Sequence, residues 1–328
     1  MTPFLEHIKA VCIKYSVPFQ IQSGLLQFGK EYETACLAGG NTPNHVLFSQ
    51  FIQAIDEQMV RPYSFSLYHK ARRVPLDYYK MGLDFIRPLI DFKRSQLLGK
   101  DELLEIQKCC KACENVILLA NHQTEIDPQI ISLLIEDVTP DLAVDMVFVA
   151  GHRVIADPMA VPLSLGRNLI CIYSKRHIAE PPEKKAEKLK TNQNALAALQ
   201  KLLDAGGACI YIAPSGGRDR KGSSGEVEVA PFDPDSIEML LLLAKKAKAK
   251  THFYPLALST YHLLPPPDSI LTEIGEQRST NFAASHLYFG KRLDITLAEK
   301  ASPEEKRQER QKRAERIWQL VVTMYHSF

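Results

Sequence analysis

Long hydrophobic runs are absent from this chain of 328 residues: none approaches the roughly 18–20 apolar residues that a membrane-spanning helix requires. The first residues also lack the basic start, apolar centre and small-residue cleavage site of a signal peptide, and they are not rich in arginine and serine as a transit peptide is. The sequence therefore predicts no transmembrane segment and no visible targeting segment.

An excess of one charge is also missing. Lys and Arg number 40 against 38 Asp and Glu, for a formal net charge of +2. A nucleic-acid-binding domain normally carries a stronger basic excess, so we expect no nucleic-acid partner.

The seven cysteines are odd in number and irregularly spaced, which is typical of a reducing compartment. Cys110 and Cys113 form a lone C-x-x-C without a second pair or a His-x-x-x-His partner, so the sequence predicts no zinc site. We expect these two cysteines to face a core from one helix. A G-x-G-x-x-G motif that opens a helix is lacking too, so a dinucleotide site is not indicated.

The N-terminal part has apolar residues at helical spacing, in the segments 4–16, 44–60 and 64–72. A helical pattern also covers residues 76–98. The residue before a proline disfavours helix, which favours a boundary near Pro75. The sequence thus predicts a small helical bundle over residues 1–74 and a second domain over residues 75–328.

Apolar, β-rich runs recur after about residue 100, at 116–120, 146–150, 169–173, 208–213, 253–258 and 286–289. Helical patterns alternate with them at 101–113, 128–137, 186–204 and 235–248, and a charged helix is expected over 303–325. This alternation predicts an α/β fold with a mixed, largely parallel sheet and helices on both faces.

His122 and Asp127 lie in a turn after the first of these strands, where open α/β sheets place their chemistry. A neutral imidazole there can take a proton from an alcohol, and a carboxylate can hold its tautomer. Pro128 suits a first helical position, so Asp127 is expected to be the N-cap. The alternative is that His122 is a polar loop residue and Asp127 only a helix cap.

Basic residues follow two further strands, and together they could bind one anionic group. Arg176 and His177 follow the strand at 169–173, and Arg218 and Arg220 follow the strand at 208–213. Arginine suits phosphate because its planar fork donates two parallel hydrogen bonds. The alternative is that these are solvated turn cations, or that the two arginines pair with Asp219 between them.

The turn Ser215-Gly216-Gly217 supports two interpretations. Its backbone N–H groups could approach an anion or an oxyanion closely. It also resembles a hydrolase nucleophile elbow whose first glycine is replaced by Ala213. That alternative makes the protein a serine hydrolase with Ser215 as nucleophile and His252 or His262 as base. A third possibility is a phosphate- or lipid-binding scaffold without turnover.

The spacing His122-x-x-x-x-Asp127 matches the motif that opens the glycerolipid acyltransferase family. The chain is similar to the soluble glycerol-3-phosphate 1-acyltransferases of plastids and chlamydiae, over about residues 100–290 and more loosely in the N-terminal part. The segments that carry this resemblance are 121–128, 149–151, 166–169, 173–175, 213–220 and 230–233. Arg176 departs from it, because lysine is expected there in the plastid enzymes. The resemblance implies an N-terminal helical bundle on an α/β catalytic domain.

The resemblance further implies that His122 and Asp127 form the catalytic pair, and that Arg176, His177, Arg218 and Arg220 hold the phosphate of glycerol 3-phosphate. The implied reaction moves an acyl group from a thioester of acyl carrier protein or coenzyme A to the sn-1 hydroxyl, the first step of phospholipid synthesis. It needs no cofactor and no metal. The expected location is the bacterial cytoplasm, or the plastid stroma for a processed form, with at most peripheral membrane contact.

Overall fold

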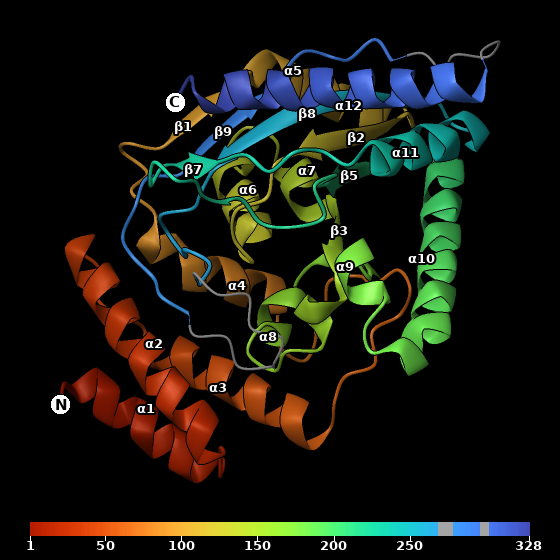
Figure 1. The fold of residues 1–328 in the computed structure, drawn as a ribbon. Helices are drawn as coiled ribbons and strands as arrows, with labels where there is room; N and C mark the ends of the chain where they lie inside the picture. The colour runs from red at the N-terminus through yellow and green to blue at the C-terminus, as the bar shows by residue number, and fades with distance from the viewer. Residues whose placement is uncertain (268–277, 296–301) are drawn as a thin grey trace.

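The computed structural model describes residues 1–267, 278–295 and 302–328, and it shows a sheet layered between helices with a helical bundle at one side (Figure 1). The described strands form a seven-stranded sheet in the order β1-β9-β8-β2-β5-β3-β4. Neighbouring strands are parallel except β8 and β9, which are antiparallel. The predicted mixed, largely parallel sheet is therefore confirmed.

All six predicted strands are present within a few residues of their expected bounds. The strands of this sheet are β1 (Gln96–Leu98), β2 (Asn115–Ala120), β3 (Val147–Gly151), β4 (Asn168–Ile172), β5 (Cys209–Ile212), β8 (Thr251–Ser259) and β9 (His286–Phe289). A separate antiparallel pair consists of β6 (Arg220–Lys221) and β7 (Val227–Glu228). Strand β2 lies between β5 and β8, and every residue of β2 is buried, which explains its continuous apolar sequence.

Helices cover both faces of the sheet. One face packs against α10 (Lys185–Ala205), α11 (Pro234–Lys246) and α12 (Pro303–Tyr325). The other face packs against α5 (Lys100–Lys111), α6 (Asp127–Ile135) and α7 (Pro140–Asp145). In the parts of the chain that the structure describes, no helix is both long and apolar enough to cross a bilayer.

The N-terminal helices are α1 (Pro3–Lys14), α2 (Phe19–Ala38) and α3 (His45–Val60). The Thr2 side chain caps α1, and the Asn44 side chain caps α3 by accepting from Leu47 N at 3.0 Å. Their apolar faces share one core with α4 (Tyr78–Ile86), α6 and α8 (Val161–Ser164). The bundle thus packs on α4 and α8, and α4 in turn packs on α6, the helix that follows His122.

Two helical predictions in this region were wrong. Residues 64–72 form no helix, because their backbone bonds elsewhere: His69 N donates to Leu169 O at 2.9 Å, and Arg72 N donates to Leu165 O at 2.8 Å. The helix expected over 76–98 is α4, which ends at Ile86 before Pro88, followed by a 3-10 turn and then β1.

The remaining short elements are 3-10 turns and one helical turn: η1 (Arg87–Leu89), η2 (His152–Ile155), η3 (Pro182–Lys184) and α9 (Lys175–Ile178). The expected placement of Cys110 and Cys113 on one core-facing helix was also wrong. Helix α5 ends at Lys111, and Cys113 is exposed with a φ of 59°.

Gly99 joins β1 to α5 where no side chain fits. Its φ is +71°, and a Cβ added there would lie 1.8 Å from Phe289 O. We expect Gly99→Ala to lower the free energy of unfolding by about 3 kcal/mol, because a backbone atom must move. The control Gly24→Ala lies within α2 with nothing within 4 Å of its added Cβ, and it should raise stability by about 0.5–1 kcal/mol. Urea unfolding measures both, and equal effects would contradict this account.

Candidate active site

The turn after β2 brings His122 and Asp127 together. His122 Nδ1 lies 2.8 Å from Asp127 Oδ2, and the carboxylate accepts the ring N–H. The Asp127 side chain is fully buried, whereas that of His122 is 30% exposed. With its proton on Nδ1, the ring directs an unprotonated Nε2 outward, as a general base requires. No residue in the described part of the chain makes a hydrogen bond with Nε2.

Asp127 is held by donors from both sides of its carboxylate. Gln123 N donates to Oδ2 at 2.8 Å, and Thr124 N donates to Oδ1 at 3.2 Å. The expected N-cap role of Asp127 was wrong, because α6 begins at Asp127 itself and Ile126 is the N-cap residue. The carboxylate points away from the helix, toward the preceding turn that contains His122. The carboxylate therefore fixes the histidine turn rather than the start of the helix.

Thr260, which the sequence interpretation missed, completes this arrangement. Its Oγ1 donates to Asp127 Oδ1 at 2.6 Å, and its side chain is buried. The available signal was its position directly after β8, the strand next to β2. A polar residue at a neighbouring strand end is a candidate contact for chemistry placed at the same edge.

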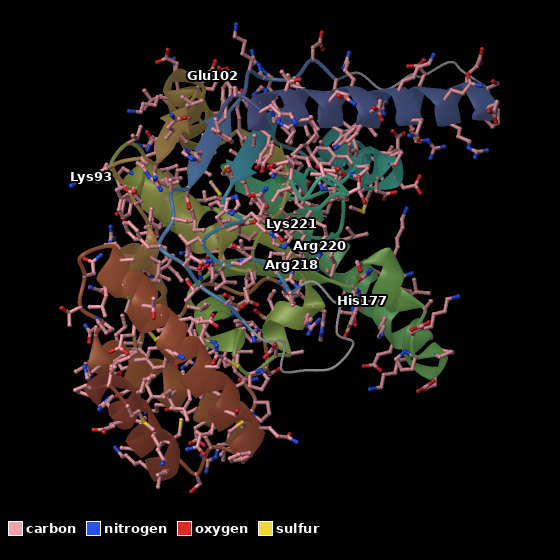
Figure 2. The ribbon with its side chains drawn as sticks, turned by 60° about the vertical axis from the view of Figure 1, so that its left-hand side comes forward. Lys93, Glu102, His177, Arg218, Arg220 and Lys221 are labelled. Atoms are coloured by element: carbon pink, nitrogen blue, oxygen red, sulfur yellow. The ribbon has the colours of Figure 1, made fainter. Side chains whose placement is uncertain are left out.

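The turn after β5 lies against the histidine turn. Asp219 N donates to His122 O at 2.6 Å. The segment that carries Arg218 and Arg220 is therefore hydrogen-bonded to the backbone of His122. Arg218, Arg220 and Lys221 follow one another along this connection (Figure 2). Arg220 Nη1 also donates to Pro267 O at 2.7 Å. The backbone between the two arginines is therefore hydrogen-bonded to the backbone of His122, and their binding of one anion stays a prediction.

The turn after β4 is next to the β5 turn. A Cβ built on Gly216 would lie 4.0 Å from Ser174 Cβ. His177, in α9, is exposed, and its Nδ1 is 2.8 Å from Ser174 Oγ. The side chain of Arg176 lies outside the described part of the chain, so its expected contact stays a prediction.

Ser215, Gly216 and Gly217 form a tight turn. Ser215 Oγ donates to Gly217 O at 3.0 Å, and Gly216 N donates to Ala213 O at 3.1 Å. Gly216 has a φ of +65°, which explains glycine at this position. The Gly216 amide is thus engaged within the turn, and an oxyanion there would have to be met by the amides of Ser215 and Gly217.

The proposed hydrolase base His252 is far from Ser215. His252 aligns with Val116 near the start of β2, and Val116 aligns with Cys209 at the start of β5. Ser215 comes after the other end of β5. The structure therefore contradicts a Ser215–His252 pair, and the Ser215 hydroxyl is directed to a carbonyl rather than to an imidazole.

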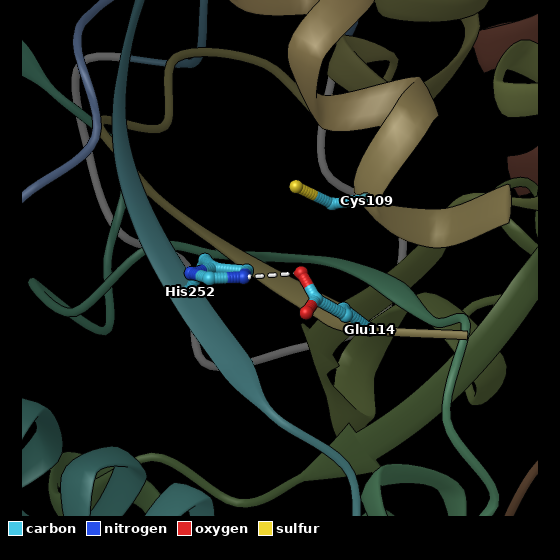
Figure 3. Close-up of side chains that lie close together, drawn as sticks. All are labelled: Cys109, Glu114 and His252. Carbon is cyan, nitrogen blue, oxygen red and sulfur yellow. Dashed lines mark hydrogen bonds and ion pairs between the residues drawn. The ribbon is translucent and has the colours of Figure 1, made fainter. Parts of the chain in front are cut away.

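Three side chains with potential metal-ligand atoms lie together at that opposite end of the strands. Ligand atoms of Cys109, Glu114 and His252 are within 4.8 Å of one another (Figure 3). His252 Nε2 lies 2.7 Å from Glu114 Oε2, and this hydrogen bond lowers the pKa of Glu114. Arg292 Nη1 faces His252 Nδ1 at 3.4 Å, and Lys250 Nζ is 3.8 Å from Glu114 Oε1. Lys250 and Arg292 already compensate the charge of the Glu114 carboxylate. The hydrogen bond between His252 and Glu114 therefore accounts for the close approach of these side chains.

Comparison with known proteins identifies relatives of this chain. Residues 102–259 match the acyltransferase family model. A chloroplastic glycerol-3-phosphate acyltransferase of Cucurbita moschata, ATS11, is 41% identical over 283 residues, which cover 85% of this chain and 63% of that protein. The chloroplastic glycerol-3-phosphate acyltransferase of Arabidopsis thaliana is 38% identical over 308 residues, which cover 92% of this chain and 67% of that protein.

Among solved structures, the 1-acyl-sn-glycerophosphate acyltransferase PlsC of Thermotoga maritima aligns over 73% of this chain and 76% of its own, with 18% identity and a TM-score of 0.37. The chain spans 63% to 67% of the length of the two plant relatives. At this identity and coverage, the chain belongs to the glycerol-3-phosphate acyltransferase family.

Proposed function

We propose that the protein transfers a fatty acyl group from a thioester to the sn-1 hydroxyl of glycerol 3-phosphate and releases 1-acyl-glycerol 3-phosphate. The observation that carries this proposal is the hydrogen bond of 2.8 Å from His122 Nδ1 to the buried Asp127 carboxylate. It leaves Nε2 as a base for an alcohol. The plant relatives, which are named glycerol-3-phosphate acyltransferases, support glycerol 3-phosphate as that alcohol.

The proposed step is a direct attack of the alcohol. The sn-1 oxygen forms a bond to the thioester carbonyl carbon while His122 Nε2 takes the hydroxyl proton. The tetrahedral intermediate then expels the thiol, which receives that proton from the imidazolium as the carbon–sulfur bond breaks. Asp127 holds the ring in the required tautomer and stabilises its charged form. Because the substrate alcohol is the nucleophile, this route needs no covalent enzyme intermediate and no cofactor.

We assign the phosphate of the substrate to the basic residues of the two neighbouring turns. Arg218 and Arg220 are carried by the connection bonded to His122 O, and His177 and Arg176 belong to the turn beside it. Charge-assisted hydrogen bonds from guanidinium to phosphate are strong and directional. This placement would set the sn-1 hydroxyl, at the other end of a three-carbon molecule, near Nε2. The Ser215–Gly217 turn is the proposed source of backbone donors to the oxyanion.

The acyl donor in this proposal is a thioester of acyl carrier protein or of coenzyme A. The compartment is the plastid stroma or the bacterial cytoplasm, and the chloroplastic names of the relatives support the first. We also propose residues 1–74 and 75–328 as the bundle and catalytic domains, joined by the core that α1–α3 share with α4 and α6.

Replacing Arg218 with alanine tests the phosphate assignment. We expect the KM for glycerol 3-phosphate to rise by about tenfold to a hundredfold, because a charge-assisted hydrogen bond contributes about 1.5–3 kcal/mol. The KM for the acyl donor should change by less than about twofold. The matched control is Arg307→Ala, which removes an exposed arginine of α12 and should leave both constants unchanged. Steady-state kinetics with each substrate varied measures this, and equal rises in both constants would count against the assignment.

A further inference from the structure

Asp219 is a buried carboxylate between the two turns of the site. Its Oδ2 accepts from Asn121 Nδ2 at 2.7 Å and from Gln123 Nε2 at 3.2 Å. Its Oδ1 accepts from Ala230 N at 3.0 Å. Asn121 and Gln123 flank His122, so the carboxylate of Asp219 and its backbone N–H both bind the histidine turn. The side chain of Asp219 is fully buried.

The side-chain amides of Asn121 and Gln123, which face Asp219, cannot rotate to exchange their oxygen and nitrogen atoms without losing other hydrogen bonds. Asn121 Oδ1 accepts from Leu258 N at 2.7 Å, and Asn121 Nδ2 also donates to Leu258 O at 2.9 Å. Gln123 Oε1 accepts from Thr260 N at 2.6 Å. These bonds fix each NH2 group toward Asp219. Both carboxylate oxygens of Asp219 therefore meet N–H donors, and a side chain that only accepts hydrogen bonds fits the position.

The ionised form is favoured by these bonds and opposed by burial. Burial raises the pKa of Asp219 to about 6, while the hydrogen bonds from Ala230, Asn121 and Gln123 each lower it. The three N–H donors thus stabilise the ionised carboxylate against the cost of its burial. The ionisable side chains that interact with this charge include His122, Tyr211 and Tyr325.

We infer that Asp219 is a positioning residue that sets Arg218 and Arg220 at a fixed distance from His122, and so fixes the spacing between the phosphate and the reacting hydroxyl. This inference rests on the proposed function. The neighbours of Asp219 in the chain are the two arginines, and its own contacts reach both sides of the histidine. Loss of the carboxylate would remove the bonds to Asn121, Gln123 and Ala230, so that the arginine turn keeps its backbone bond to His122 O but loses its side-chain anchor. The His122–Asp127 bond would stay in place.

The test is Asp219→Asn, which keeps the size of the side chain. In either orientation, the new NH2 group faces an existing donor, because Ala230 N lies on one side and the amides of Asn121 and Gln123 lie on the other. We expect the KM for glycerol 3-phosphate to rise at least tenfold. The KM for the acyl donor should stay within twofold, and kcat should fall less than the KM for glycerol 3-phosphate rises.

The matched control is Asp204→Asn in α10. Its carboxylate also accepts from one glutamine amide, Gln200 Nε2 at 3.0 Å, and from one backbone N–H, Lys248 N at 3.2 Å. That variant should lower thermal stability at most and leave both KM values unchanged. A role of Asp219 in stability alone would give the same pattern for Asp219→Asn, and that result would overturn the inference.

A second variant, Asp219→Ala, covers the case in which the asparagine variant does not fold, because its small cavity lets water meet the three donors. Asp219→Ala should show the same rise in the KM for glycerol 3-phosphate without a rise in the KM for the acyl donor. If neither variant folds, Asp219 is a determinant of folding and the positioning role is rejected. Wild-type protein that forms no acylated product would instead defeat the proposed function, so the two failures are distinguishable.

Discussion

Replacing His122 with alanine is expected to lower kcat by about a thousandfold or more, near the upper part of the range for a general base. The reason is the position of the ring: Nδ1 is bound to Asp127 Oδ2 at 2.8 Å, and only Nε2 can take the substrate proton. The KM for glycerol 3-phosphate should change little, because the phosphate is assigned to residues of other turns. Rapid-quench or steady-state assays of product ester measure the change.

His262→Ala is the matched control. His262 is exposed on the segment after β8 and was the second candidate base of the hydrolase hypothesis. We expect that variant to retain wild-type kcat. Full activity of His122→Ala, or loss of activity in His262→Ala with His122 intact, would remove His122 from its proposed role.

Asp127→Asn should reduce kcat by about a hundredfold to ten-thousandfold, through the tautomer of His122. An asparagine amide must meet Gln123 N and Thr124 N, which already donate to the carboxylate. An amide oxygen in the place of Oδ1 keeps Thr124 N and Thr260 Oγ1 as donors. The NH2 group then takes the place of Oδ2, where it faces Gln123 N and donates to His122 Nδ1. The ring proton would move to Nε2, where it blocks proton abstraction. The loss should appear in kcat, with the KM for glycerol 3-phosphate within about threefold of wild type.

The control for this change is Asp141→Asn, an exposed carboxylate of α7 that pairs with Lys111 at 3.1 Å. It should leave kcat unchanged. Thermal unfolding of Asp127→Asn shows whether the variant is folded at the assay temperature. A folded variant with undiminished kcat would show that the carboxylate does not set the tautomer.

The sheet could be predicted from the sequence because its strands are buried on both faces, and their continuous apolar runs reflect that burial. The placement of His122 and Asp127 followed from the same signal, since β2 ends at Ala120 and the turn must begin there. The neighbouring position of the β5 turn also follows, because β2 and β5 are adjacent parallel strands.

Contacts between distant segments could not be predicted in this way. Thr260 reaches Asp127 from a different strand end, and Asp219 meets Asn121 across 98 positions of chain. Residues 64–72 have a helical pattern but bond to Leu165 and Leu169, so tertiary backbone bonds override local preference there. Asp127 was expected to cap its helix because its local sequence allows it, but donors supplied by the fold turn its carboxylate toward His122.

Acyl transfer to glycerol 3-phosphate can be measured by incubation of the purified protein with radiolabelled glycerol 3-phosphate and, in parallel, oleoyl or palmitoyl thioesters of acyl carrier protein and of coenzyme A. Separation of the products by position of the ester identifies the reaction and the donor together. We predict labelled 1-acyl-glycerol 3-phosphate and one free thiol for each ester formed. Folded protein that forms no labelled ester with either donor, or that releases free fatty acid instead, would contradict acyl transfer to glycerol 3-phosphate.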